Sequence, residues 1–388
     1  MNPALCNHEL APARLEPPPG PAQINGEAAT WASVIRILLR AELITQRELL
    51  CAKIEITPLS GRNGNAMVSI DKQARFVVRL SPADPDVLSP SAEAELIGYM
   101  RDDLGLAHVL PRCAYRSDGE HCFVLDYVQR SENLRLHWAR KQRLPAFHAT
   151  RLGTLLSVLH GASVSPGNKL KWHAAGPSIL KLCTPQASHY LDSSPAVLRT
   201  IGLLQRSTSL QQALADLENG WQPTHLCHND IRSENLLLTR STPSARVSGL
   251  MLIDWELAGM GDPAWDLAGV LSEYAGYFID SIPTSSHFPP GRFLPWANFG
   301  TWHVRELAQR FWSAYSTGGG AACEAGPAET LLRKALGFVP ARLAQTAIER
   351  VQRKSSVDLA NGMLLQLAEN MACDAQAAED IFGLALRL

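Results

Sequence analysis

The sequence predicts an α+β protein of two lobes, in which a small antiparallel sheet is followed by a larger, mainly helical portion. Three observations support this prediction. Short β-prone runs, broken by Gly, Asn and Asp, lie between residues 53 and 80, and a further strand is expected from His121 to Val128. Beyond about residue 130, apolar residues recur mostly at helical spacing. Two lobes that share one cleft account for 388 residues without a further domain.

The N-terminal part divides into an arm and a first lobe. Residues 1–29 contain six prolines and few residues that could pack, so this arm should carry no catalysis. Residues 30–128 form the first lobe. Two short helices should precede its first strand, because apolar residues follow Trp31 at helical spacing and Thr45 with Glu48 has the pattern of a capping box. A further helix is expected from Ala92 to Asp103.

Residues 129–388 form the second lobe, which is mainly helical. One pair of strands near residues 236–253 interrupts the helices. Helices are expected over residues 198–217, 301–315, 328–337, 340–354 and 356–387.

Charge and cysteine content exclude several classes of function. Lys and Arg total 36 against 37 Asp and Glu, so no strongly basic surface is available for nucleic acid or for an anionic membrane. The eight cysteines are scattered and include no Cys-x-x-Cys pair, which favours free thiols over a zinc or redox site. No basic leader or long apolar stretch is present, and we expect a soluble cytoplasmic protein.

Two neighbouring motifs point to chemistry. Residues 227–235, with the sequence CHNDIRSEN, match the spacing His-x-Asp-x-x-x-x-Asn of a kinase catalytic loop. An apolar run then ends in Asp254-Trp255-Glu256. If residues 236–239 and 249–253 pair as antiparallel strands, Asn235 and Asp254 become neighbours at one end of the hairpin.

This arrangement suits phosphoryl transfer, which depends on positioning and on neutralising the charge of the moving group. An amide oxygen from Asn235 and the carboxylate of Asp254 are hard oxygen ligands of the kind that Mg²⁺ prefers. Glu256 is a candidate ligand for a second Mg²⁺. Asp230 is the candidate base, placed to orient an acceptor hydroxyl and to accept its proton.

Three sequence blocks resemble the aminoglycoside phosphotransferase and choline kinase family: residues 228–235, residues 252–256 and the run GDPAWDLA at 261–268. The resemblance covers roughly residues 55–275. It implies a bilobal, protein-kinase-like fold that uses ATP and Mg²⁺. It further implies that Asp266 is a buried support for the catalytic loop, and His228 is expected to support the same loop through hydrogen bonds.

The resemblance extends to candidate nucleotide-binding residues in the first lobe. Arg79 stands where a protein kinase has lysine, in the strand that carries the cation for the nucleotide phosphates, and the alternative is a solvated edge-strand arginine. Glu93 is the expected partner of Arg79, with Glu95 as a competitor. The turn that would cover the phosphates contains Gly61, Asn63, Gly64 and Asn65.

The run Leu125-Asp126-Tyr127-Val128 resembles the family's hinge between the lobes. Backbone groups of Asp126 and Val128 are expected to meet the edge of the adenine ring.

The acceptor stays open between two classes. The family favours a hydroxyl group of a small molecule, such as an aminoglycoside or an amino alcohol. Arg232 lies two residues after Asp230, where Ser/Thr protein kinases carry a lysine near the transferred phosphate, and this favours a Ser/Thr peptide, as in lanthipeptide-type pathways. A third reading is a pseudokinase scaffold, suggested by Arg79, although the presence of Asp230, Asn235 and Asp254 together argues against it.

Overall fold

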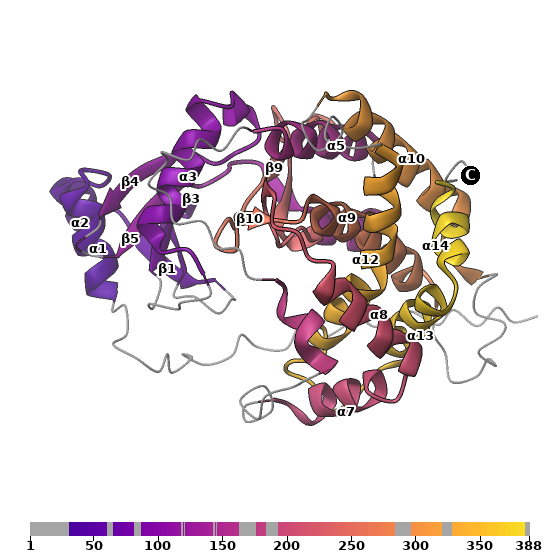
Figure 1. Ribbon diagram of the computed structural model, residues 1–388. Coiled ribbons are helices and arrows are strands. Elements are labelled where there is room, and N and C mark those ends of the chain that lie inside the picture. Colours follow the sequence, from indigo (N-terminus) through magenta and orange to yellow (C-terminus); the bar gives the residue numbers. More distant parts are fainter. Residues whose placement is uncertain are drawn as a thin grey trace, which may run out of the picture.

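The chain folds into two lobes with a few short strands between them (Figure 1). The computed structural model describes residues 31–59, 65–80, 87–117, 119, 121–142, 144, 146–162, 176–183, 193–283, 296–319 and 328–384. In the described residues, the first lobe contains one sheet, three α-helices and a short 3-10 helix (Leu106–His108), and the second lobe is mainly helical. The predicted α+β architecture is therefore confirmed. The arm at residues 1–29 lies outside the described residues.

The sheet of the first lobe is antiparallel and has the strand order β1-β2-β3-β5-β4. Its strands are β1 (Ile54–Pro58), β2 (Ala66–Ile70), β3 (Gln73–Leu80), β4 (Cys113–Ser117) and β5 (Cys122–Asp126). Side chains alternate between the two faces of a strand. Phe76 and Val78 pack in a core with α1 (Trp31–Arg40), whereas Val77 packs against the main core on the other face. Arg79 shares the face of Val77.

Helix α3 (Pro90–Asp102) covers this second face and begins with a well-formed cap. The Ser89 side chain accepts a hydrogen bond from the N–H of Ala92, and Pro90 occupies the first turn, where its missing N–H costs nothing. Helix α2 (Gln46–Cys51) has the predicted capping box between Thr45 and Glu48. The start of α3 is also tied to the second lobe, since the N–H of Leu88 donates to the carbonyl of Glu256 at 2.7 Å.

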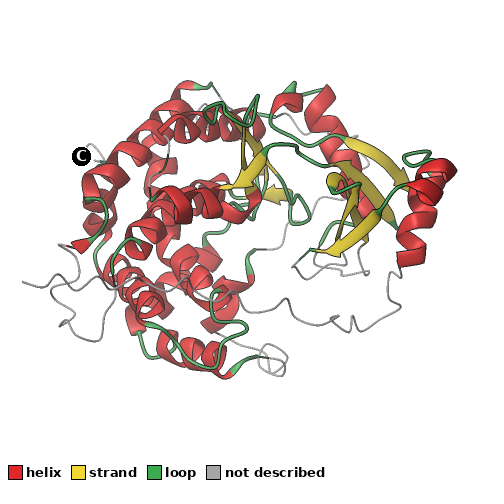
Figure 2. Ribbon diagram, turned by 180° about the vertical axis from the view of Figure 1, so that it is seen from behind, coloured by secondary structure: helices red, strands yellow, loops and turns green. Residues whose placement is uncertain are grey.

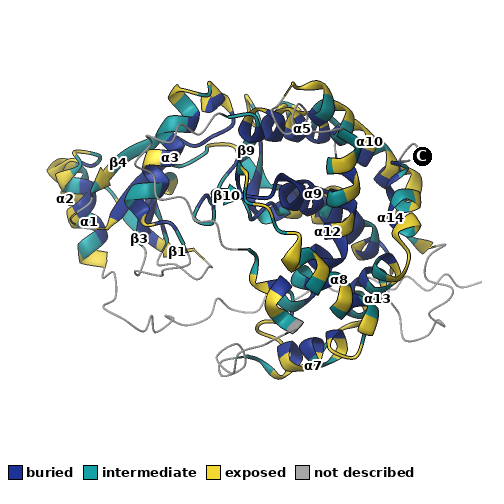
Figure 3. Cartoon of the chain, viewed as in Figure 1, coloured by how far each residue is buried: buried dark blue, intermediate teal, exposed yellow. Residues whose placement is uncertain are grey.

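Helix α9 (Pro263–Asp280) is the centre of the second lobe and is buried along most of its length (Figure 3). Helix α12 (Ala328–Glu349) packs along it, and α5 (Ala146–His160) packs against α10 (Thr301–Thr317). The remaining α-helices described in this lobe are α4 (Leu134–Lys141), α7 (Pro195–Leu204), α8 (Thr208–Asn219), α13 (Leu359–Cys373) and α14 (Ala375–Phe382).

Short strands lie at the base of the second lobe, next to the first (Figure 2). The predicted hairpin is confirmed as β8 (Leu236–Thr239) and β9 (Gly249–Leu252), with Leu236 opposite Leu252. Strand β6 (Ser131–Asn133) adds to β8, and β7 (His225–Cys227) pairs with β10 (Gly259–Gly261). These additional strands were not predicted, because three residues are too few to form a recognisable pattern.

Several helix boundaries differ from the prediction. Residues 198–217 form two helices, because the Ser207 side chain accepts a hydrogen bond from the N–H of Leu210 and starts α8 there. The segment 356–387 breaks at Asp374, which caps α14 in the same way. Conversely, the predicted helices 328–337 and 340–354 are one helix that runs through Pro340, whose neighbours Val339 and Ala341 are fully buried. Tertiary packing therefore outweighs the cost of the proline.

None of the helices in the described ranges is both long enough and apolar enough to cross a membrane.

Candidate active site

The loop after β7 is held by a single buried carboxylate. Asp266, in the first turn of α9, accepts hydrogen bonds from the backbone N–H of His228 at 2.7 Å and of Asn229 at 2.8 Å. Asn229 has a φ of 64°, in the left-handed region, so the chain turns sharply at this point. The side chain of Asn229 donates to the carbonyl of Leu257 at 3.0 Å. Asp230 follows this turn and is 7% exposed.

His228 supports the loop from inside, in the manner the sequence predicts. Its Nδ1 atom accepts from the N–H of Asp230 at 3.2 Å, and its Nε2 atom lies 3.0 Å from the carbonyl of Ile253, to which it donates. Its ring also contacts Trp255 edge to face, with centroids 4.5 Å apart. Burial lowers the pKa of His228, although Asp266 and Asp230 oppose that shift. The neutral ring is therefore a structural support.

The hairpin brings the predicted polar residues together. The carbonyl of Asn235 accepts from the N–H of Ile253 at 2.9 Å, so Asn235 and Asp254 lie on adjacent strand ends. The Asn235 amide nitrogen donates to the backbone carbonyl and to the Oδ2 atom of Asp230, both at 3.0 Å. Asp254 has a φ of 69°, and this left-handed turn is followed by the fully buried Trp255.

Arg79 reaches across from β3 to this group and is 7% exposed. Its guanidinium lies 2.6 Å from Asp254, 2.5 Å from Glu256 and 3.2 Å from Glu93. Burial opposes the charge, yet Glu93 and Asp254 raise the pKa of Arg79 further above its usual range. β3 is the middle strand of five, so Arg79 is not the solvated edge-strand residue of the alternative reading.

Glu93 is the glutamate that pairs with Arg79, whereas Glu95 is exposed on the outer side of α3. Glu93 is 2% exposed, and it also accepts from the N–H of Trp255 at 3.2 Å. Burial raises the pKa of Glu93 to about 7, although Arg79 favours the ionised form. One side chain therefore connects β3, α3 and the segment that carries Asp254.

The site has an excess of negative charge. Burial and the nearby Asp254 both raise the pKa of Glu256. Within the described ranges, the carboxylates of Asp230, Asp254, Glu256 and Glu93 form ion pairs with two cationic side chains, Arg79 and Arg232. A buried surplus of acidic oxygens is destabilising unless a cation or a proton compensates it. The donor set of carboxylates and an amide consequently fits a hard divalent cation such as Mg²⁺.

A third group of contacts comes from helix α12. Arg232 lies 3.3 Å from Asp230 and donates to Glu349 at 3.2 Å. One turn and two turns earlier on the same face, Gln345 donates to Glu349 at 2.8 Å and Arg342 donates to the carbonyl of Ile231. This face of α12 thus contacts the loop that carries Asp230.

Some of the predicted nucleotide-binding residues of the first lobe have described contacts, and others lie outside the described residues. The N–H of Asp126 donates to the carbonyl of Arg112 at 2.9 Å, and the carbonyl of Val128 accepts from the Ser131 hydroxyl at 2.7 Å. The carbonyl of Asn65 accepts from the N–H of Leu59 at 2.8 Å. Gly61, Asn63 and Gly64 lie outside the described residues.

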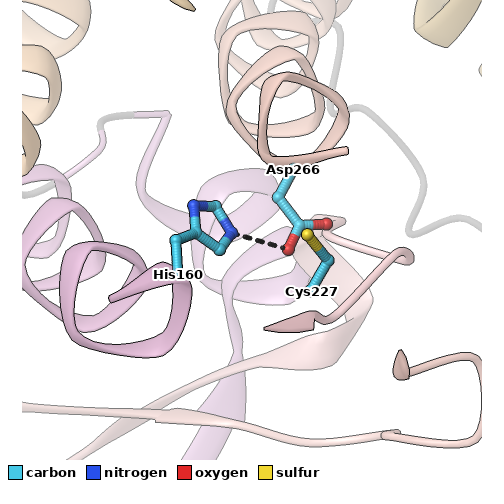
Figure 4. A group of neighbouring side chains, drawn as sticks. All are labelled: His160, Cys227 and Asp266. Carbon is cyan, nitrogen blue, oxygen red and sulfur yellow. Dashed lines mark hydrogen bonds and ion pairs between the residues drawn. The ribbon is translucent and has the colours of Figure 1, made fainter. Parts of the chain in front are cut away.

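Behind the loop, His160 and Cys227 join Asp266 in a fully buried cluster (Figure 4). Ligand atoms of the three residues lie within 4.8 Å of one another, which raises the question of a metal site. His160 binds Asp266 at 3.3 Å and Tyr315 at 3.0 Å. Both oxygens of Asp266 already accept backbone N–H groups, and burial raises the pKa of the Cys227 thiol well above its usual value. The cluster is therefore a hydrogen-bonded support.

Comparison with known proteins fits this geometry. A family model described as the phosphotransferase enzyme family matches residues 55–325. The chain belongs to this family.

Relatives within the phosphotransferase family are distant. The thiamine kinase of Escherichia coli O17:K52:H18 (strain UMN026 / ExPEC) is 29% identical over 214 residues, which are 55% of this chain and 64% of that protein. The thiamine kinase of Escherichia coli (strain K12) is 29% identical over 247 residues, covering 61% of this chain and 76% of that protein. The chain thus spans less than two thirds of the first relative's length.

The fold is also similar to that of a solved choline kinase. The crystal structure of choline kinase from Cryptosporidium parvum Iowa II is 12% identical, with a TM-score of 0.51, and covers 91% of this chain and 99% of that chain. At this identity the likeness concerns the fold alone. It agrees with the protein-kinase-like, two-lobed architecture.

Sequence reasoning missed Glu349 and the support that His160 and Arg342 provide. A glutamate near the end of a helix more than a hundred residues away carries no local signal of its contact with Arg232. The spacing of Arg342, Gln345 and Glu349 at i, i+3 and i+7 places them on one helix face. That pattern could have been recognised as a polar face on an otherwise buried helix.

Replacing Asp266 by asparagine tests the support. In Asp266→Asn the amide NH₂ must face one of the two backbone N–H groups. We therefore expect the free energy of unfolding to fall by about 1–3 kcal/mol. Urea unfolding followed by circular dichroism measures the change. Asp216→Asn on the exposed face of α8 is the matched control, expected within about 0.5 kcal/mol of wild type. Equal stabilities for the two variants would contradict the assignment.

Proposed function

We propose that this protein is an ATP- and Mg²⁺-dependent phosphotransferase that moves the γ-phosphate of ATP to a hydroxyl group of a small molecule. The convergence of Asp230, Asn235 and Asp254 is the observation that carries this proposal. Asn235 donates to Asp230, and its strand end lies beside that of Asp254. A pure scaffold has no need of this combination, and membership of the phosphotransferase family supports the same conclusion.

Asp230 is proposed as the base. It lies at the tip of a loop held by Asp266 and His228, so its carboxylate keeps one orientation. A fixed carboxylate can orient the acceptor hydroxyl for in-line attack and accept its proton as the new O–P bond forms. Arg232 contacts Asp230 and is held by Glu349, which places a permanent positive charge beside the same oxygen atoms.

Asp254 and Asn235 are proposed to hold Mg²⁺, with Glu256 as a further ligand. The Asn235 amide nitrogen points to Asp230, which leaves its oxygen for another partner. When bound, Mg²⁺ would neutralise charge on the nucleotide phosphates. Arg79 contacts Asp254 and Glu256, and its fork of donors is suited to phosphate oxygens.

The adenine is proposed to bind at the connection between the lobes. The N–H of Asp126 and the carbonyl of Val128 are already bonded within the protein. The carbonyl of Asp126 and the N–H of Val128 are therefore the groups assigned to the edge of the adenine. Asn65, with Gly61, Asn63 and Gly64, is proposed to cover the phosphates.

A small molecule is preferred as the acceptor because the relatives found by sequence are thiamine kinases. Arg232 is the feature that keeps a Ser/Thr peptide as the alternative acceptor. The structure assigns it a contact with Glu349 of the same chain, so its position is explained without a peptide.

Two substitutions separate the base from the metal ligand. Asp230→Asn should retain Mg²⁺-dependent ATP binding while phosphoryl transfer falls about a hundredfold or more, because the positioned base is lost. Asp254→Asn should weaken both Mg²⁺-ATP binding and transfer, because a metal ligand loses its charge. Calorimetric titration with ATP at several Mg²⁺ concentrations, together with turnover assays, measures both effects. Near-normal turnover in Asp230→Asn, or unchanged Mg²⁺ dependence in Asp254→Asn, would reject the respective role.

The proposed role of Arg79 at the nucleotide phosphates is tested by changing the charge and the length of its side chain. Arg79→Lys should keep appreciable activity, whereas Arg79→Ala should raise the apparent KM for ATP. Glu93→Gln should move the ATP KM in the same direction as Arg79→Ala, because it removes a partner of the guanidinium. Glu95→Gln is the matched control on the exposed face and should leave ATP kinetics unchanged. Identical ATP kinetics in wild type and Arg79→Ala would remove Arg79 from the nucleotide site.

The acceptor is tested with two substrate panels analysed by mass spectrometry. One panel contains thiamine, choline-like amino alcohols, aminoglycosides and sugars, and the other contains Ser/Thr peptides. We expect a gain of about 80 Da, one phosphate, on a hydroxyl compound of the first panel and none with Asp230→Asn. Phosphopeptide formation without any small-molecule product would replace the proposed acceptor class while leaving the kinase assignment intact.

A further inference from the structure

A basic cavity lies behind the hairpin, lined by residues of β6, α4, α5 and the β8–β9 turn. Its volume is about 860 Å³, within the range of small-molecule sites. Glu132 is the single acidic residue among the lining residues. Four cationic side chains also line the cavity: Arg140, Lys141, Arg240 and Arg246. The cavity is thus strongly positive, although the whole chain has a formal net charge of −1.

Glu132 organises the cavity without neutralising it. Its Oε1 atom lies 2.6 Å from Arg140, 2.5 Å from Arg240 and 2.7 Å from the Nδ1 atom of His137. Burial opposes ionisation, but these donors, Arg140 foremost, lower the pKa of Glu132 to about 2. A guanidinium has five N–H donors, so one carboxylate leaves several of them unused. The two like-charged guanidiniums are held beside the same oxygen atom.

Two further cations increase the positive surplus. Lys141 and Arg246 line the cavity, and both are exposed. Neither forms an ion pair with another described residue. Apolar surface is also present, from Phe147, Pro243 and Val247. A ligand with a multiply charged anionic group and a small organic part would match both kinds of surface.

We propose that this cavity binds a phosphate group, as a phosphomonoester or a pyrophosphate, separately from the nucleotide site. Paired guanidiniums recognise the several oxygens of such a group with charge-assisted hydrogen bonds. Glu132 keeps the guanidiniums in place before the ligand arrives, which reduces the entropy lost on binding. The proposal stands independently of the proposed function, because none of its residues belongs to the candidate active site.

The cavity lies next to strands β6 and β8 and to the connection between the lobes. Glu132 pairs with Leu238 in the β6–β8 ladder, and Arg240 directly follows β8, the strand that begins after Asn235. Ser131, another lining residue, binds the carbonyl of Val128. A ligand in the cavity would therefore lie next to the connection between the lobes and to strand β8.

The test is calorimetric titration of the full-length protein with inorganic pyrophosphate in EDTA, which removes metal-dependent binding at the active site. We expect one saturable site whose affinity falls at least tenfold in Lys141→Gln/Arg246→Gln, a double variant that leaves the contacts of Glu132 intact. Arg240→Gln should weaken binding similarly. Arg310→Gln on α10 is the control for a general loss of positive charge, and it should bind within twofold of wild type.

Two further measurements decide where and from which source the anion binds. Arg79→Gln should bind pyrophosphate as wild type does, whereas loss of binding in Arg79→Gln with full binding in the cavity variants would overturn the proposal. Co-sedimentation with phosphatidylcholine vesicles containing phosphatidic acid tests a lipid-borne phosphate. Vesicle binding that depends on Lys141 and Arg246 would assign the site to a lipid headgroup. Failure of both pyrophosphate and vesicles to bind wild type would also overturn it.

Discussion

The geometry of the site depends on the buried carboxylate of Asp266. Its two oxygens bind two successive backbone N–H groups, and two such bonds define the direction of the chain that follows. Burial opposes ionisation, yet the hydrogen bonds from His160 and the backbone of His228 keep the pKa of Asp266 below its usual range. Because Asp266 belongs to α9, these hydrogen bonds fix the loop that carries Asp230 relative to the buried central helix of the second lobe.

The two lobes meet through ionic contacts as well as through packing. Arg79 comes from the first lobe, whereas Asp254 and Glu256 come from the second, and Glu93 binds groups on both sides. Such charges have low-dielectric surroundings, so each depends strongly on its partners. A change in the ion-pair partner of one of these carboxylates would consequently change how the two lobes are held relative to each other. Under the proposed function, nucleotide phosphates and metal ions would enter a cluster whose charges are already partly compensated.

Local patterns predicted which residues of the candidate site lie close together. The spacing of Asp230, Asn235 and Asp254 along a loop and a hairpin is decided by neighbouring residues. Glu93 is favoured over Glu95 by the resemblance of the apolar residues that follow it to the family's pattern. The contact between Arg232 and Glu349 could not be predicted in this way, because it depends on how α12 packs on α9. The continuous helix through Pro340 and the break at Ser207 have the same origin, since packing and capping overrode the propensity pattern.

The arginine in β3 has a consequence for chemical labelling. Where a nucleotide site contains a lysine, reagents that carry an acyl group next to the phosphates can react with its amine, because a lysine can lose its proton in a protein. The guanidinium of Arg79 keeps its proton, and its carboxylate neighbours raise its pKa further. Amine-directed nucleotide reagents therefore have no target at this position. Activity-based surveys that rely on such reagents would not register this protein through Arg79, whatever its turnover.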